Sequence, residues 1–382
     1  MTRDQTFPPP NKLLGLELLR FLAAFAVLIW HYRHFAFVAD KPVDLVSDRL
    51  PFYDLLQVFY VAGEYGVWIF WSISGFIFFW KYRDAIADRS IGGWKFFVFR
   101  LSRLYPLHVV TLALVAILQP VYLHLNGYFF VYQFNDLQHF LLQIFMAGSW
   151  GFQSGYSFNA PVWSISVEVL VYAVFFLMLR FVTRSALLNL VIIVACLGIR
   201  DQITACLSFF YIGGLAAMAR RAISSSPRRG IVEGVAWFAA VTLAVSGWVL
   251  ASHRIELPDL AIIAYTPILL FCISGDIRVS PVIQRWIETA GNLTYSSYLL
   301  HFPLQLLIVL GFAMVGSPVP FYDPSFFVAF IAVTLVASRL TYLYFEAPAQ
   351  DMIRDRLLSR SEAEASTSLF AATAQARPRR AD

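Results

Sequence analysis

The sequence is short of charged residues. Only 14% of its 382 residues are Asp, Glu, Lys or Arg, against roughly a quarter in an ordinary soluble domain. Hydrophobic residues make up 59% of the chain, more than a soluble core of this size can hide from water. These values exclude a conventional soluble protein and predict an all-α, polytopic integral membrane protein surrounded by lipid.

Cysteine is also scarce. The three cysteines, Cys196, Cys206 and Cys272, lie inside apolar runs, and the chain has no CxxC spacing. This pattern excludes a disulfide framework and predicts no metal site. The net charge of +5 is not the signature of nucleic-acid binding in such a chain, so we expect no nucleic-acid partner.

Long apolar runs dominate the sequence instead. A helix needs about 20 apolar residues to cross the ~30 Å hydrocarbon layer. The runs predict about ten transmembrane helices, at 13–34, 58–80, 104–124, 162–182, 186–201, 203–219, 231–251, 258–274, 293–315 and 325–345. The amphipathic stretch 137–148 is too short to span, so we expect it on the membrane surface or against the bundle.

The basic residues indicate the orientation, because cytoplasmic loops are enriched in Lys and Arg. With ten spans, 22 of the 29 Lys and Arg residues fall on the side of the N-terminus and 5 on the opposite side, while Arg20 and Arg339 lie inside spans. Segment 125–160 contains neither residue type. The split predicts that both termini are cytoplasmic and that segment 125–160 is external.

The two ends of the chain are polar. Residues 1–12 are proline-rich and too polar for a cleaved signal peptide, so we expect a cytoplasmic segment before a retained first helix. Residues 349–382 are rich in Ala, Ser, Arg and Glu and predict a disordered cytoplasmic tail. The membrane domain is expected to occupy residues 13–348.

The first span carries three ionisable residues, Glu17, Arg20 and His31. On a helix, His31 lies about 20° from Arg20 and about 40° from Glu17 around the axis, so the three share one stripe. We expect the stripe to face the bundle interior, with His31 ~16 Å further from the cytoplasm than Arg20. The alternative is a Glu17–Arg20 ion pair at the interface and a hydrated helix end at His31.

Two further polar pairs lie near span ends. Arg100 and Arg103 are one turn apart at the cytoplasmic end of the third span, where they could grip phosphate or could simply anchor the helix. Ser164 and Glu168 share a face of the fourth span, where a carboxylate is either functional or a buried acceptor. In the ninth span, His301 is either functional or a helix-to-helix hydrogen-bonding group.

Together and in this order, these motifs resemble the acyltransferase 3 family of membrane O-acyltransferases. The similarity covers about residues 13–348, with Trp71 standing where the family often has a second Phe. The chain is not expected to carry the SGNH esterase-like domain of some members. The matching residues are Glu17, Leu19, Arg20, Ala23, Ala24, His31, Gly66, Phe70, Ser74, Gly75, Phe76, Arg100, Arg103, Pro106, Trp163, Ser164, Ser166, Glu168, Tyr295, Ser296, Tyr298, Leu299, His301, Glu346 and Pro348.

The resemblance implies a multi-pass enzyme of the bacterial inner membrane. Such proteins move an acyl group, usually acetyl, from cytoplasmic acyl-coenzyme A to a sugar hydroxyl of a surface polysaccharide, lipopolysaccharide or lipid-linked glycan. Acyl-coenzyme A would be a co-substrate rather than a permanently bound cofactor. The other expected partners are the glycan or lipid-linked sugar and membrane lipid.

The resemblance and the positions of the residues together suggest roles. Arg20, Arg100 and Arg103 would hold the coenzyme A phosphates. His31 would be the general base, oriented by Glu168 or Glu17, with His301 as the competing candidate. The residues expected to bind substrate are Trp163, Ser164, Ser166, Tyr298 and His301. An acyl-histidine intermediate stays open, and the alternative function is a secondary transporter or exporter.

Overall fold

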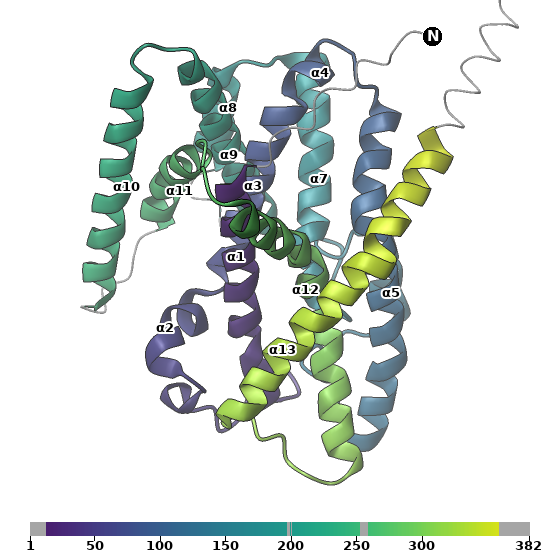
Figure 1. The fold of residues 1–382 in the computed structure, drawn as a ribbon. Helices are drawn as coiled ribbons and strands as arrows, with labels where there is room; N and C mark the ends of the chain where they lie inside the picture. Colours follow the sequence, from purple (N-terminus) through teal and green to yellow (C-terminus); the bar gives the residue numbers. More distant parts are fainter. Residues whose placement is uncertain (1–12, 197–198, 200, 253–258, 359–382) are drawn as a thin grey trace, which may run out of the picture.

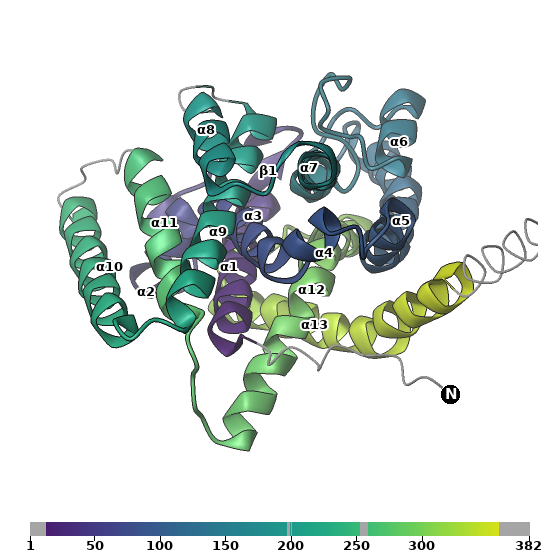
Figure 2. The same ribbon diagram turned by 90° about the horizontal axis from the view of Figure 1, so that it is seen from above.

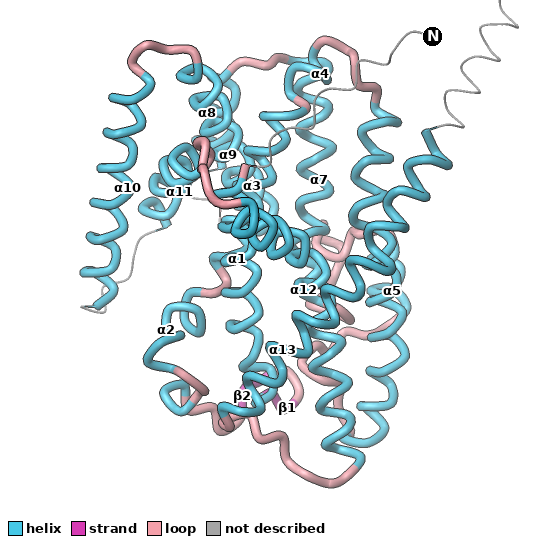
Figure 3. The backbone as a smooth tube through the Cα atoms, viewed as in Figure 1, coloured by secondary structure: helices cyan, strands magenta, loops and turns pink. Residues whose placement is uncertain are grey.

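The computed structural model describes residues 13–196, 199, 201–252 and 259–358, and most of them are helical (Figure 1). Within these ranges the only strands are β1 (Phe37–Val38) and β2 (Lys41–Pro42), which form one short antiparallel pair (Figure 3). The all-α prediction is therefore confirmed. Helices dominate because a chain in lipid must satisfy its backbone N–H and C=O groups internally.

The long helices follow the predicted apolar runs in order. They are α1 (Leu14–Tyr32), α2 (Tyr53–Ala62), α3 (Tyr65–Lys81), α5 (Gly93–Asn126), α7 (Trp163–Leu177), α8 (Ala186–Cys196), α9 (Gln202–Ser224), α10 (Arg229–Ser252), α11 (Asp259–Ile273), α12 (Pro281–Met314) and α13 (Pro324–Thr341). The shorter helices are η1 (Arg33–Ala36), η2 (Ser47–Arg49), α4 (Arg83–Ala87), α6 (Leu137–Ile144), η3 (Ala160–Val162), η4 (Met178–Val182) and η5 (Tyr342–Glu346).

Not every predicted span forms a helix that is long enough to cross the membrane by itself. Seven helical segments of the described chain can cross a membrane by length and composition, and α2 with α3 would make an eighth, bent by 64°. Helix α8 has 11 residues, a rise of about 16 Å, so it covers about half of the hydrocarbon layer. A polytopic membrane fold follows, whereas the count of ten and the cytoplasmic termini stay predictions.

Two predictions concern segments beside the spans. Helix α6 begins where the amphipathic stretch was predicted, and it packs against α5, because His108 Nε2 lies 2.6 Å from the Gln143 carbonyl. The helical segment that starts as α13 continues to Leu358, so the tail predicted to be disordered from 349 is helical at its start. The rest of that tail and the predicted segment 1–12 lie outside the described residues.

Close helix packing fixes α3, which lies beside α9 in Figures 1 and 2. A Cβ atom on Gly75 would lie 1.8 Å from the Phe210 carbonyl oxygen, and one on Gly213 would lie 1.8 Å from the Ser72 carbonyl oxygen. Only glycine allows the two backbones to approach so closely. The contact holds α3 in place, so that its other side lines the first cavity described below.

The described residues form two large hydrophobic core clusters and one small one. The first contains Trp71, Phe76 and Phe210, the second contains Tyr32 and Phe302, and the small one lies on α10 and α11. Helix α12 packs against α1, α5 and α13, and α13 crosses the bundle diagonally in Figure 1. Polar side chains of α1 and α12 also meet within the bundle.

Candidate active site

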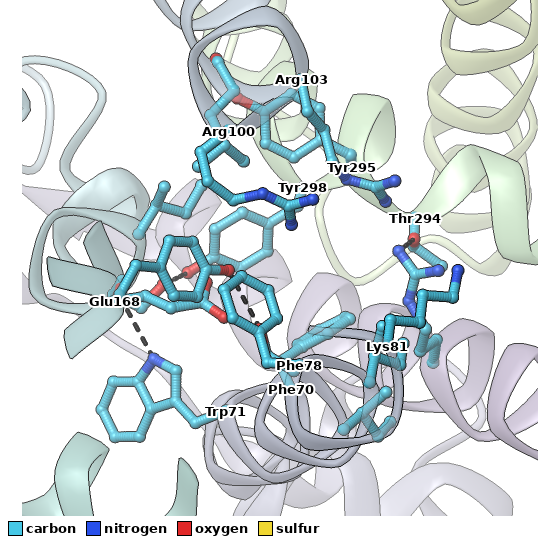
Figure 4. Close-up of a pocket in the computed structure, with 18 of the residues that line it drawn as sticks. Phe70, Trp71, Phe78, Lys81, Arg100, Arg103, Glu168, Thr294, Tyr295 and Tyr298 are labelled. Carbon is cyan, nitrogen blue, oxygen red and sulfur yellow. Dashed lines mark hydrogen bonds between the residues drawn. The ribbon is translucent and has the colours of Figure 1, made fainter. Parts of the chain in front are cut away.

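A cavity of about 310 Å³ lies between α1, α3, α5, α7 and α12, near the end of the bundle that carries α4 (Figures 1 and 4). Five cationic side chains reach it, but only two carboxylates do. The cations are Arg20, Lys81, Arg100, Arg103 and Arg354, and the carboxylates are Glu17 and Glu168. We call it the cationic cavity, and its excess of positive charge suits an anionic ligand.

Arg100 and Arg103 both reach the cationic cavity from α5 (Figure 4). Arg100 donates from Nη2 to the Tyr82 hydroxyl at 2.9 Å, and its guanidinium carbon lies 4.7 Å from the centroid of the Phe78 ring. Arg103 has no hydrogen-bond or ion-pair partner among the described residues. One guanidinium is held against aromatic rings, and the other is available to a ligand.

Arg20 enters the same cavity from α1. Its Nη1 lies 3.1 Å from Glu17 Oε2, and its Nη2 donates to Thr294 Oγ1 at 3.3 Å. The ion pair considered as an alternative therefore exists, but both of its members line the cavity. Gly291 leaves the space for Glu17, because a Cβ atom there would lie 2.1 Å from Oε2. The polar stripe of the first span faces the bundle interior, as predicted.

Glu168 reaches the cationic cavity from α7. Its side chain lies near Ser74 and Tyr172, whose hydroxyl oxygens are 3.0 Å apart. The carboxylate is also within electrostatic range of Arg100 and Arg103. Glu168 therefore partly balances the charge of the arginines.

A second cavity, of about 570 Å³, lies near the other end of α1. Six of its lining residues are aromatic, so we call it the aromatic cavity. The aromatic residues are Trp30, Phe37, Tyr132, Phe134, Tyr156 and Trp163, and the polar ones are His31, Arg33, His34, Asp40, Glu64 and Gln133. Ring faces beside hydrogen-bonding groups can bind a polar, ring-shaped ligand such as a sugar.

His31 lines the aromatic cavity with one ring nitrogen occupied. Its Nδ1 lies 2.9 Å from the Val27 carbonyl oxygen. Because a carbonyl only accepts hydrogen bonds, Nδ1 carries the proton and the neutral ring keeps the lone pair on Nε2. The ring centroids of His34 and His301 lie 4.9 Å and 4.7 Å away. A neutral imidazole with Nε2 unprotonated can act as a general base.

A thin partition separates the two cavities, which share no lining residue. At one point Trp71 of the cationic cavity meets Trp163 of the aromatic cavity, with ring centroids 5.6 Å apart. At another, Tyr298 of the cationic cavity lies 5.9 Å from His301, which lies 4.7 Å from His31. Ligands in the two cavities would be one layer of side chains apart.

The partition is braced where α12 contains a proline. Pro303 has no N–H group, so the Leu299 carbonyl loses its usual helical partner. The Asn159 side chain donates to that carbonyl from Nδ2 at 2.9 Å instead. Gln305 Nε2 donates to the carbonyl of His31 at 2.9 Å. These two side-chain bonds connect α12 to α1 and to the segment before α7.

Hydroxyl groups also brace the partition through hydrogen bonds at the start of α7. Ser164 Oγ lies 2.7 Å from the Tyr298 hydroxyl, which also donates to the Pro161 carbonyl at 2.6 Å. Trp71 Nε1 donates to the Ser164 carbonyl at 3.2 Å. The start of α7 is therefore tied to both α3 and α12.

The predicted site residues are distributed over these structures. Those that line the cationic cavity are Glu17, Arg20, Arg100, Arg103, Ser164, Glu168 and Tyr298. His31 and Trp163 line the aromatic cavity, and His301 lies in the partition. Ser166 lines neither cavity: its hydroxyl accepts from the Ser149 N–H at 3.1 Å, and its carbonyl accepts from Trp150 Nε1 at 2.8 Å. In the described chain, no His, Cys, Asp and Glu side chains group as a metal site would require.

The hypothesis that Glu168 or Glu17 orients His31 does not agree with the structure. The Val27 carbonyl holds His31 Nδ1, and both carboxylates lie in the other cavity. Glu17 cannot orient His31, because the 14 residues of α1 between them correspond to a rise of about 21 Å along the helix axis. Glu168 lines the cationic cavity, whereas His31 lines the aromatic cavity.

Several lining residues were missed from the sequence. Lys81 and Arg354 counted there only as cytoplasmic charges, and His34 was not considered. Lys81 is seven residues after Ser74, which places both on one face of α3 and could have identified Lys81. His34 is three residues after His31, which could have marked it in the same way. Arg354 had no local signal, because its helix was not expected.

The fold and its two cavities define a class of membrane protein in which an anionic ligand and a polar, ring-shaped ligand can come within one side-chain layer of each other. The family described as an acyltransferase domain matches residues 13–343. The chain therefore belongs to the acyltransferase 3 family.

One similar curated protein is the acyltransferase MdmB of Streptomyces mycarofaciens. It is 30% identical over 185 residues, which are 46% of this chain and 42% of that relative. The chain thus matches less than half the length of this relative. No solved structure matches the chain.

Proposed function

We propose that the protein transfers an acyl group, with acetyl as the expected group, from acyl-coenzyme A to a sugar hydroxyl. The donor would enter the cationic cavity from the cytoplasm. The acceptor would be a glycan or lipid-linked sugar bound in the aromatic cavity from the outer side of a bacterial inner membrane. Membrane lipid would surround the bundle.

The observation that carries this proposal is the pairing of a cationic cavity and an aromatic cavity across a thin partition. Coenzyme A combines a phosphate-bearing nucleotide with a long, thin pantetheine arm. Guanidinium groups bind phosphate oxygens in pairs, so Arg20, Arg100 and Arg103 suit the diphosphate. The arm would then point toward Tyr298 and Trp71, which bring the thioester close to the acceptor.

The proposed reaction uses His31 as the base. Nε2 takes the proton of a sugar hydroxyl while the hydroxyl oxygen attacks the thioester carbonyl. A carbon–oxygen bond forms, the carbon–sulfur bond breaks, and the coenzyme A thiolate leaves and takes up the proton from His31. In this scheme Glu168 and Glu17 do not touch His31. They position the arginines of the donor site through their charges and hydrogen bonds.

The test is acyl transfer by the purified protein in liposomes. Glycans from a strain lacking the protein serve as acceptor and acetyl-coenzyme A as donor. We expect release of free coenzyme A thiol together with an acetyl mass increment on the glycan. Cleavage without glycan acetylation would reject the acceptor. No thioester cleavage, with movement of a solute across the membrane instead, would support the transporter alternative.

A further inference from the structure

Lys81 is a cation without a partner at the edge of the cationic cavity. It is the last residue of α3, it is exposed, and its side chain lines the cavity on the same side as Thr294 and Arg103 in Figure 4. No hydrogen bond or ion pair joins it to another described residue. The positive charges of Arg103, Arg100 and Arg20 act on it, with Glu17 as the opposing charge. A second anionic group at this position would relieve the repulsion.

The other cations of the cavity are placed differently. Arg20, Arg100 and Arg103 are only partly exposed, and the first two have hydrogen-bond partners. Arg354 is held by Ser102 Oγ at 3.1 Å and by Gln350 Oε1 at 3.3 Å. Lys81 alone combines exposure with the lack of a partner among the described cations of the cavity. Its ammonium is a compact point charge with three rotatable donors, which can bind a phosphate group.

Coenzyme A has two separate anionic groups, the diphosphate and the phosphate on the ribose 3′-oxygen. If the pantetheine arm runs toward the partition, the diphosphate lies among the three arginines. The adenosine and its 3′-phosphate then lie on the side away from the partition. Lys81 is on that side, because it follows Trp71 of the partition by ten residues of α3, a rise of about 15 Å.

We propose that Lys81 binds the 3′-phosphate of the acyl-coenzyme A donor and makes the protein distinguish coenzyme A from its 3′-dephospho form. This inference rests on the proposed function. It assigns a specificity-determining contact to a residue whose other role would be electrostatic anchoring of α3 at the membrane surface. Lys95 provides the control, because it is an exposed lysine at the start of α5 that does not line the cavity.

The experiment measures binding of acetyl-coenzyme A and acetyl-3′-dephospho-coenzyme A to the purified protein in lipid nanodiscs. The natural protein should prefer acetyl-coenzyme A by about tenfold to a hundredfold, the range for a hydrogen bond between charged groups. Lys81→Gln should abolish this preference by weakening only acetyl-coenzyme A binding. Lys81→Arg should keep part of the preference, and Lys95→Gln should keep all of it.

The outcomes distinguish failure of the Lys81 contact from failure of the proposed function. Binding of both donors with equal affinity by the natural protein would overturn the role of Lys81 and leave the proposed function intact. An equal loss of affinity for both donors in Lys81→Gln, or the same loss in Lys95→Gln, would show that Lys81 acts only as an electrostatic anchor. If the natural protein binds neither donor, the proposed function fails and this inference fails with it.

Discussion

Replacing His31 with alanine should stop acyl transfer while leaving the affinity for acyl-coenzyme A unchanged. The two effects separate because the His31 ring lines the aromatic cavity, whereas the residues proposed to bind the donor line the cationic cavity. A general base contributes about 10²–10⁴-fold to a rate, so the turnover number should fall by that factor. The Val27 carbonyl fixes the tautomer, and no other described histidine lines the cavity except His34.

The assay compares single-turnover transfer with equilibrium binding of acetyl-coenzyme A. His31→Gln serves beside His31→Ala, because it keeps most of the volume that packs against Trp30 and His301 and so limits loss of stability. Both variants should bind donor normally. His301→Ala should lose less activity than His31→Ala, because His301 lies in the partition and lines neither cavity.

One result would refute this reasoning. If His31→Ala loses only a few-fold in rate while His301→Ala loses about 10²-fold or more, the base is on α12. Nε2 of His301 has no hydrogen-bond partner within the described chain, so that ring is the competing candidate. Weakened donor binding in His31→Ala would instead show that the partition moves when the ring is removed.

The remaining predictions concern the donor site, the orientation and the partition. Arg103→Ala should weaken acetyl-coenzyme A binding by about tenfold to a hundredfold, and Arg103→Lys should recover only part of it, since the paired contact is lost. Arg100→Ala should also lower thermal stability, because Arg100 packs on aromatic rings, and unchanged binding in both alanine variants would contradict the donor site. A cysteine at the exposed position Leu137 should react with an impermeant reagent in intact cells, and reaction only after lysis would reverse the topology. Asn159→Leu should cost about 1–3 kcal/mol of stability in thermal or denaturant unfolding, and less in a Pro303→Ala background that restores the helical N–H; equal costs would refute the capping role.

Composition and periodicity alone predict the lipid environment, the helices and many of the residues that line the cavities. Apolar runs of membrane length leave no other way to satisfy the backbone, so the all-α fold followed from composition. The stripe of Glu17, Arg20 and His31 followed from helical periodicity, as did the pairing of Arg100 with Arg103. These properties are local, because residues on one helix keep their relative positions whatever packs around them.

Which side chains meet depends on how the helices pack against one another. The tertiary structure assigns Glu168 to the cationic cavity and His31 to the aromatic cavity, although the sequence suggested that they act together. It also joins Asn159 to α12, 140 residues away along the chain, and adds Lys81 to the arginines. Such contacts depend on how helices rotate and cross, and a close approach such as that of α3 and α9 at Gly75 is set by packing between helices distant in sequence.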